Sequence, residues 1–401
     1  MKNSFLSVSA SPNNSNWELL ISRERNLSKK DTDIRSEFER DTNRIIHSDA
    51  YKRLKHKTQV FFSPSSDHVC TRIEHVNHVE SISYSIANYL GLNTELTRAI
   101  AMAHDLGHAP FGHQGERILS KISEEDIGVS FWHEKNGLNV VDNIELLENP
   151  DGLLDNLNLT YAVRDGIISH CGEVDEHSIV PRKEYVDLNN YTHPNQFQPI
   201  TWEACVVKIA DKISYIIRDI EDAIKLHLLD KHLDELYELL QYDKSKKINN
   251  SNVINRLVYD ICESSSPEKG ITLSSDGLKL LDGIKKFNYE YIYNNPRPRN
   301  SSAYFELIIT QIYKILKSAY SENGIVENLF KLKIYYPQLV ENFEEWLYKY
   351  WNLTDRESTN LTNKIIFDSN NEKDYYRAII YYISGMTDNF AINTYMEIIG
   401  F

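Results

Sequence analysis

The stretch HDLGHAPFGHQGE, residues 104–116, combines three histidines and two carboxylates with three glycines and one proline. Imidazole and carboxylate groups bind metal ions and transfer protons, whereas glycine and proline interrupt helices. The residues before it, TELTRAIAMA, have apolar side chains at helical intervals, and Thr94 is the expected N-cap. We therefore expect a helix to end at this stretch and the chain to bend there.

The composition predicts an all-α protein. The chain has 401 residues, 41% of them hydrophobic, with only 15 glycines and 11 prolines. Regular alternation of apolar and polar residues, the pattern of strands, is hard to find. The polar runs at 241–252, 263–270 and 294–302 are expected to be linkers or exposed turns.

The charge and the cysteines exclude several classes of protein. A net charge of -14 argues against a general nucleic-acid surface, although a local basic pocket remains compatible with it. The cysteines have no C-x-x-C spacing, which argues against a zinc ribbon or a disulfide framework; they are Cys70, Cys171, Cys205 and Cys262. The N-terminus has too short an apolar core for a secretory signal, and no segment has the length of a membrane span. We expect a soluble, cytoplasmic protein without membrane contacts.

A long amphipathic helix is expected within residues 201–229. Its buried face is predicted to consist of Val206, Ile209, Ile213, Ile216 and Ile220. Asp211 interrupts this apolar face, so its carboxylate must be paired, hydrogen-bonded or bound to a metal. Tyr215 and Asp219 follow at intervals of one turn and continue a polar stripe, which fits either a ligand-lined or a solvated face.

Histidine and aspartate side chains elsewhere could join Asp211 at one cation. His104 and Asp105 are neighbours, so at a helix end they point roughly 100° apart. His75 lies near the start of another amphipathic helix. An isolated His-Asp pair is weak evidence for a metal site, because short motifs match by chance.

Five blocks of sequence together resemble one family. They are RIIHSDAYKRLKHKTQVF, TRIEH, HDLGHAPFGHQGE, ADKISYIIRDIEDA and YYISGMTDNFA. In this order they are similar to the deoxyguanosinetriphosphate triphosphohydrolase family of HD-domain phosphohydrolases, relatives of the SAM-and-HD-domain dNTPases. The resemblance extends from Trp17 to Ala391 and has no motif between about residues 235 and 375.

The resemblance implies a helical HD-domain core over residues 1–240 and a helical C-terminal region over 241–401. The C-terminal region would complete the nucleotide pocket and supply oligomer contacts. It also implies one divalent ion, Mg, Mn or Fe, held by His75, His104, Asp105 and Asp211. Two imidazoles and two carboxylates leave positions open on an octahedral ion, as an active site requires. The implied reaction converts a dNTP, with dGTP preferred or with broad specificity, into a deoxynucleoside and inorganic triphosphate.

The resemblance also implies roles for single residues. His113 is the catalytic histidine and Glu116 its partner, while His108 and His133 face the triphosphate. The implied substrate-binding residues are Arg72 and Lys212 for the phosphates, Gln59, Tyr215 and Asp219 for the sugar, and Tyr382 for closing the nucleoside pocket. The sequence departs from the family at Tyr381, where an aspartate is usual, and at His78, to which no role is assigned.

Two other functions remain open. One is an HD phosphodiesterase or nucleotidase. His108 argues against this function, because two-metal phosphodiesterases tend to have a lysine at that position. The other is a catalytically degenerate protein that binds single-stranded nucleic acid, for which the run KRLKHK is a weak indication. The family usually forms homo-oligomers, so a hexamer or tetramer is expected. The resemblance is also compatible with regulation by a nucleotide or by single-stranded DNA.

Overall fold

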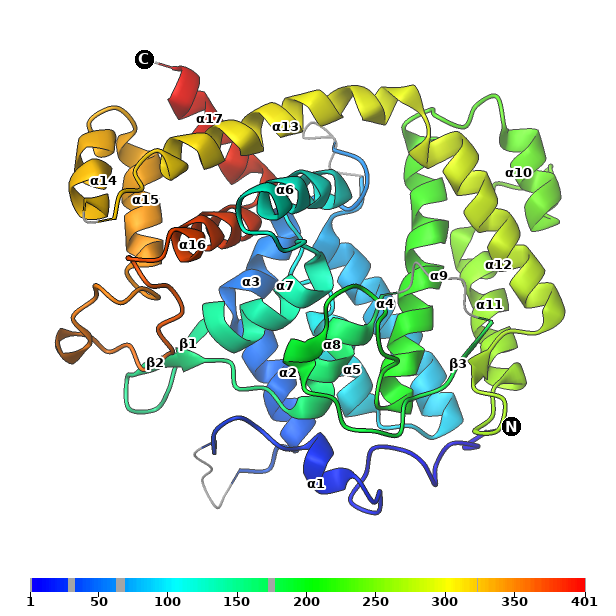
Figure 1. Ribbon diagram of the computed structural model, residues 1–401. Helices are drawn as coiled ribbons and strands as arrows, with labels where there is room; N and C mark the ends of the chain where they lie inside the picture. Colours follow the sequence, from blue (N-terminus) through cyan, green and yellow to red (C-terminus); the bar gives the residue numbers. More distant parts are fainter. Residues whose placement is uncertain (1, 28–32, 63–68, 172–176, 323, 401) are drawn as a thin grey trace. The chain divides into compact units, whose positions relative to one another are not determined.

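The computed structural model describes residues 2–27, 33–62, 69–171, 177–322 and 324–400. Helices dominate it (Figure 1), which confirms the all-α prediction. The named strands of the described residues form two antiparallel pairs, β1 (Leu146–Glu148) with β2 (Leu154–Asn156) and β3 (Ser178–Ile179) with β4 (Ile271–Thr272). These strands are only two or three residues long and build no core of their own.

The chain divides into two compact units. The first comprises Met1–Asn43, Gln59–His104 and Leu159–Asn300, and the second comprises Arg44–Thr58, Asp105–Asn158 and Ser301–Phe401. Residue 240, the expected boundary between an N-terminal core and a C-terminal region, lies inside the first unit. That boundary stays a prediction.

Helices α4, α5 and α9 form the centre of the first unit, because each of them packs against the other two. Helix α8 packs on α5 and α9, while α11 and α12 pack on α9. The helices assigned wholly to this unit are α1 (Trp17–Leu20), α4 (Arg72–Leu90), α5 (Thr94–Ala103), α8 (Tyr161–Ser169), η3 (Leu188–Asn190), α9 (Trp202–Lys225), α10 (Leu233–Leu240), α11 (Asn250–Ser264), α12 (Ser275–Asn288) and η4 (Tyr289–Tyr293).

In the second unit, α16 packs against α6, and α15 packs against α14, α16 and α17. Its helices are α3 (Asp49–Arg53), η1 (Leu54–His56), α6 (Gly112–Asp126), α7 (His133–Asn139), η2 (Val140–Ile144), α14 (Ile325–Lys333), α15 (Pro337–Leu347), η5 (Arg356–Ser358), α16 (Glu372–Ser384) and α17 (Asp388–Ile399). Helices α2 (Glu37–His47) and α13 (Pro296–Lys317) each contain a boundary between the units.

Local sequence signals explain where the central helices begin. At α4, the Glu74 carboxylate accepts hydrogen bonds from the Thr71 backbone N–H at 2.8 Å and the Thr71 hydroxyl at 3.1 Å, as in a capping box. Helix α4 ends at Gly91, whose φ of 83° is in the left-handed region that favours glycine. Helix α9 begins after Thr201 and buries the five predicted apolar residues, Val206, Ile209, Ile213, Ile216 and Ile220.

Several local predictions differ from the structure, among them the turns predicted at 241–252 and 263–270, into which α11 extends at its two ends. The N-cap of α5 is Asn93 and not Thr94, because the Asn93 amide oxygen accepts from the N–H groups of Glu95 and Leu96 at 3.0 Å. Thr94 is instead the first helical residue. The segment 294–302 is not only a turn, because α13 starts at Pro296, a position where the fixed φ of proline suits the first helical turn.

Asp388 is a buried carboxylate that joins three segments of the second unit. Located at the start of α17, it accepts hydrogen bonds from the backbone N–H groups of Thr58 and Phe111, both at 2.8 Å. The neighbouring Lys57 is also buried, and its ammonium group donates to the carbonyl oxygens of His108 and, at 2.9 Å, Ser384. These bonds anchor the bend after residue 104 to the last two helices.

We expect Asp388→Ala to lower the free energy of unfolding by about 2–4 kcal/mol, because two backbone N–H groups lose their acceptor. Urea unfolding followed by circular dichroism measures the change. Asp276→Ala is the control, since Asp276 is in the first turn of α12 but its side chain is 85% exposed. This control should change the free energy by less than about 1 kcal/mol. Equal losses in both variants would contradict the anchoring role.

Candidate functional site

Three of the predicted metal ligands meet inside the first unit. His75 lies on α4, His104 directly follows α5, and Asp211 lies on α9. The His75 Nε2 atom is 2.9 Å from Asp211 Oδ1 and 3.4 Å from His104 Nε2. The distance from His104 Nε2 to Asp211 Oδ1 is 3.7 Å. The packing of the three central helices therefore brings these three ligand atoms together.

The chemistry of this triad fits a divalent ion. His104 Nδ1 lies 2.7 Å from the carbonyl oxygen of Ala101, so this nitrogen donates its proton and the Nε2 lone pair faces the triad. Adjacent ligand atoms around an octahedral ion lie about 3 Å apart when each is 2.0–2.2 Å from the metal. The triad has similar spacings. Burial raises the pKa of Asp211, but the hydrogen bond of His75 and the neighbouring imidazole of His104 outweigh it and lower that pKa.

Asp105 directly follows His104 in the chain, but it belongs to the second unit. There its Oδ1 atom lies 3.0 Å from Nε2 of His108. Its role as the fourth metal ligand stays a prediction.

No sequence pattern singled out His170, yet the structure places it beside the triad. This buried residue follows α8, and its ring centroid lies 5.0 Å from that of His104. Its Nδ1 atom lies 2.7 Å from the carbonyl oxygen of Ile167, which repeats the arrangement of His104 and Ala101. The only available signal was a histidine at the end of a largely apolar helix, a pattern with many structural explanations.

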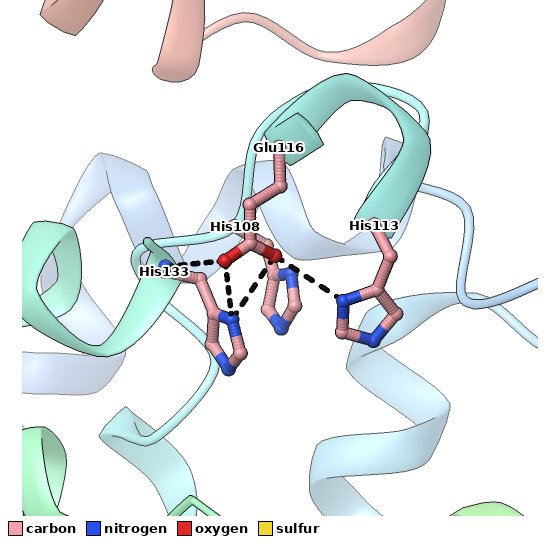
Figure 2. A group of neighbouring side chains, drawn as sticks. All are labelled: His108, His113, Glu116 and His133. Carbon is pink, nitrogen blue, oxygen red and sulfur yellow. Dashed lines mark hydrogen bonds and ion pairs between the residues drawn. The ribbon is translucent and has the colours of Figure 1, made fainter. Parts of the chain in front are cut away.

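The second unit contains a cluster of His108, His113, Glu116 and His133, in which the Glu116 carboxylate is central (Figure 2). His113 Nδ1 lies 3.2 Å from Glu116 Oε2 on the same helix, α6, so the predicted pairing at a spacing of three is present. His133, at the start of α7, approaches with Nδ1 3.1 Å from both carboxylate oxygens, and its backbone N–H donates to Oε1 at 2.8 Å. The His108 ring stacks on that of His133 with a centroid distance of 3.9 Å.

The backbone around this cluster has room only for glycine at Gly107. A Cβ atom there would lie 2.0 Å from the carbonyl oxygen of His133 and 2.1 Å from the N atom of Gly137. Phe111 has a φ of 63°, in the left-handed region, and Asp388 binds its N–H group. Close packing and this bend explain why glycines stand among the histidines of residues 104–116.

In the histidine cluster, neighbouring charges and burial shift pKa values in opposite directions. Burial raises the pKa of Glu116, but the charge of His133 and the hydrogen bonds of both histidines hold it well below its usual value. Burial likewise lowers the pKa of His133, but the charges of Glu134 and Glu116 raise it to about 10. His133 is therefore a partly buried cation at neutral pH, beside the stacked ring of His108.

The predicted substrate-binding residues, apart from Tyr382, lie in the first unit. Arg72 and Lys212 are buried, and an Arg72 Nη2 atom lies 3.5 Å from the backbone carbonyl oxygen of Gln59. Tyr215 and Asp219 lie one turn apart on α9. The hydroxyl of Tyr293, a residue that no motif indicated, donates to the Asp219 carboxylate. Burial and the charge of Asp219 raise the pKa of Tyr293, so it stays a neutral donor.

Tyr382 lies in the second unit, on α16, and borders a cavity of about 310 Å³. Its ring packs against those of Phe343 and Trp346, with centroid distances of 5.1 and 5.7 Å. Its buried hydroxyl has no hydrogen-bond partner within the part of the chain that the structure describes. Tyr381, the departure from the family pattern, and Arg53 also line this cavity.

The family model described as "HD domain" matches residues 72–216, the range that contains the triad and the histidine cluster. A deoxyguanosinetriphosphate triphosphohydrolase-like protein of Rickettsia felis is 31% identical over 398 residues, which cover 94% of this chain and 96% of that protein. The chain belongs to this family of HD-domain phosphohydrolases. A relative with the same description from Caldanaerobacter subterraneus is 32% identical, with 94% of this chain and 89% of that protein covered.

Membership in this family makes the chain a hydrolase of the HD class, with candidate ligands for a divalent metal. Among the described helices, none has the length and apolar character needed to cross a membrane.

The opposed pKa shifts of Glu116 and His133 predict when their ion pair stabilises the fold. The Glu116 contribution is present above its ordinary pKa of 4.5 and is lost as the pH falls through the lower folded value. The His133 contribution is present below its ordinary pKa of 6.5 and is lost as the pH rises through about 10. The pair is therefore most stabilising between these two ordinary values.

We expect Glu116→Gln to lower the free energy of unfolding more at about pH 6 than above about pH 10, where His133 loses its charge. Urea unfolding measures the free energy of unfolding at each pH, and EDTA in the buffer keeps metal from binding. Glu124→Gln, at an exposed position of the same helix, is the control and should not show this pH dependence. An equal loss at both pH values would contradict the charged pair.

Proposed function

We propose that the protein hydrolyses a dNTP to a deoxynucleoside and inorganic triphosphate, with one divalent ion, Mg, Mn or Fe. The observation that carries this proposal is the triad of His75, His104 and Asp211 in a chain that aligns over 94% of its length with triphosphohydrolase-like relatives. Asp105, the residue after His104, is the proposed fourth ligand.

In this reaction, water attacks the α-phosphorus and the 5'-oxygen of the deoxynucleoside leaves. When bound, a divalent ion polarises the phosphoryl group and lowers the pKa of a coordinated water from about 15.7 toward about 7. The ligands proposed to hold it supply two imidazoles and two carboxylates, which leaves coordination positions for water and a phosphate oxygen.

We assign the proton transfer to His113. Its Nδ1 atom faces Glu116, so Nε2 is the atom that can exchange a proton with substrate, and the side chain is 46% exposed. Glu116 orients the ring, as a general acid–base histidine requires. In the proposed general-acid step, Nε2–H donates its proton to the departing 5'-oxygen.

Cationic side chains would hold the triphosphate. His133 stays protonated at neutral pH because Glu134 and Glu116 raise its pKa to about 10, and His108 stacks on it. Arg72 and Lys212 supply a guanidinium fork and an ammonium group, the two common phosphate-binding groups.

The deoxyribose is proposed to bind to Gln59, Tyr215 and Asp219. Tyr293 already donates a hydrogen bond to Asp219, which orders the carboxylate, and a carboxylate is a suitable acceptor for a sugar hydroxyl. Tyr382 is proposed to help close the nucleoside pocket. The proposal covers dGTP preference as well as broad base specificity. It also includes assembly into a hexamer or tetramer. Control by a nucleotide or single-stranded DNA effector is its last part.

The experiment that tests the reaction is product analysis after incubation with each dNTP and with GTP in the presence of Mn or Mg. We expect deoxynucleoside and intact triphosphate, with dGTP cleaved faster than GTP. Buried polar groups left unsatisfied by a misplaced hydroxyl cost about 1–3 kcal/mol, which corresponds to about 5- to 150-fold in rate. Release of dNMP and pyrophosphate would overturn the proposed reaction, and equal rates on GTP would overturn the sugar site.

Metal content separates the proposed ligands from the proton-transfer residue. We expect His104→Ala to lose both bound metal and turnover, whereas His113→Ala keeps the metal and loses about 100- to 10,000-fold in rate. Elemental analysis and kinetics of the purified variants measure the two effects. A metal-free or fully active His113→Ala protein would refute the assigned role.

A further inference from the structure

Helix α14 carries a row of exposed apolar side chains. Val326, Phe330 and Ile334, the last being the C-cap directly after α14 (Ile325–Lys333), follow at intervals of four and are 57%, 69% and 72% exposed. Residues at this spacing lie on one helix face. Ile325 and Leu329, on another face of α14, are buried, and the helix packs against α15. The exposed row therefore does not serve the internal packing of the helix; we call these three residues the α14 stripe.

Two opposite charges border the α14 stripe along one edge. Glu327 follows Val326 by one residue, and Lys331 follows Phe330 by one residue, so both are displaced to the same side. Their side chains form an ion pair of 2.6 Å within the helix and are 71% and 62% exposed, respectively. This edge therefore carries a negative and a positive charge one turn apart, both accessible to a partner.

We propose that the α14 stripe binds the same stripe of a second copy of this chain, with the two helices antiparallel and a two-fold axis near Phe330. Two-fold symmetry places Val326 across from Ile334 of the second copy, and Phe330 beside its equivalent. It also brings the same edges together. Glu327 then lies near Lys331 of the second copy, and Lys331 near its Glu327.

This charge pattern selects a second copy as the occupant. A surface with a negative and a positive charge along the same edge is complementary to itself when turned antiparallel. An unrelated partner would require no such self-complementarity. The contact would shield three large apolar side chains that a monomer leaves in water, which is the main driving force for such an association. The inference is independent of the proposed reaction.

Charge reversal tests the pairing directly. Glu327→Lys leaves two lysines on the edge, and Lys331→Glu leaves two glutamates, so like charges face each other in each homodimer. We expect each single variant to associate at least 10-fold more weakly than the unchanged protein in sedimentation analysis over a concentration series. Mixing the two variants should restore association, because each edge then meets its opposite. The double variant Glu327→Lys/Lys331→Glu should also associate.

Tyr259→Glu is the matched control, because Tyr259 on α11 is 69% exposed and lies outside the α14 stripe. It should leave the association unchanged. The proposal is overturned if the unchanged protein is monomeric at all concentrations, if the single variants associate normally, or if their mixture stays dissociated. Because all these side chains are exposed, circular dichroism should show the same helix content in every variant.

A cysteine at the two-fold axis tests the register. We expect Phe330→Cys to give a disulfide-linked dimer on oxidation with copper–phenanthroline, since the two thiols would face each other. The four native cysteines are buried, which keeps the background low. Tyr259→Cys should give no cross-linked dimer. Failure of Phe330→Cys to cross-link would overturn the antiparallel arrangement.

Discussion

Two buried charged residues at positions 57 and 388 hold together the part of the second unit that carries the histidines. Lys57 donates to the carbonyl oxygens of His108 and Ser384, and Asp388 accepts from the N–H groups of Thr58 and Phe111. A buried charge is costly unless it is paired or hydrogen-bonded. The three segments must therefore stay in contact, and the position of His108 depends on residues almost 280 positions later in the sequence.

Within this frame, the histidine cluster is positioned by one carboxylate. Glu116 accepts from the rings of His113 and His133 and from the backbone N–H of His133. Each histidine is thereby oriented through Nδ1, which leaves Nε2 to face other groups. Because the close approach at Gly107 excludes any side chain, the bend and helix α7 remain in contact and the stacking of His108 on His133 is preserved.

The triad in the first unit depends on a different force. Apolar faces of α4, α5 and α9 pack together, and the three proposed ligands are the polar positions on or next to those faces. Burial makes an isolated carboxylate unfavourable, so Asp211 needs the two imidazoles or a metal ion. The same packing that stabilises the helices thus also concentrates the ligand atoms.

The sequence by itself determined the helical class, the buried face of α9, the need of Asp211 for a partner and the spacing of His113 and Glu116. These features follow from the periodicity of a helix and from the cost of a charge on an apolar face, both of which are local. The two imidazoles of the triad were predicted from the resemblance to a family and not from periodicity. It did not determine the N-cap at Asn93 or the start of α13 at Pro296, where several neighbouring residues could serve equally well.

Only the tertiary structure decided which distant residues meet within each unit. His170 stands beside His104, Tyr293 donates to Asp219, and His133 shares Glu116 with His113. No periodicity connects these pairs, because their contacts arise from the packing of helices that are far apart in the sequence. The order of residues specifies what each helix can bury, whereas the packing of the helices decides which side chains meet.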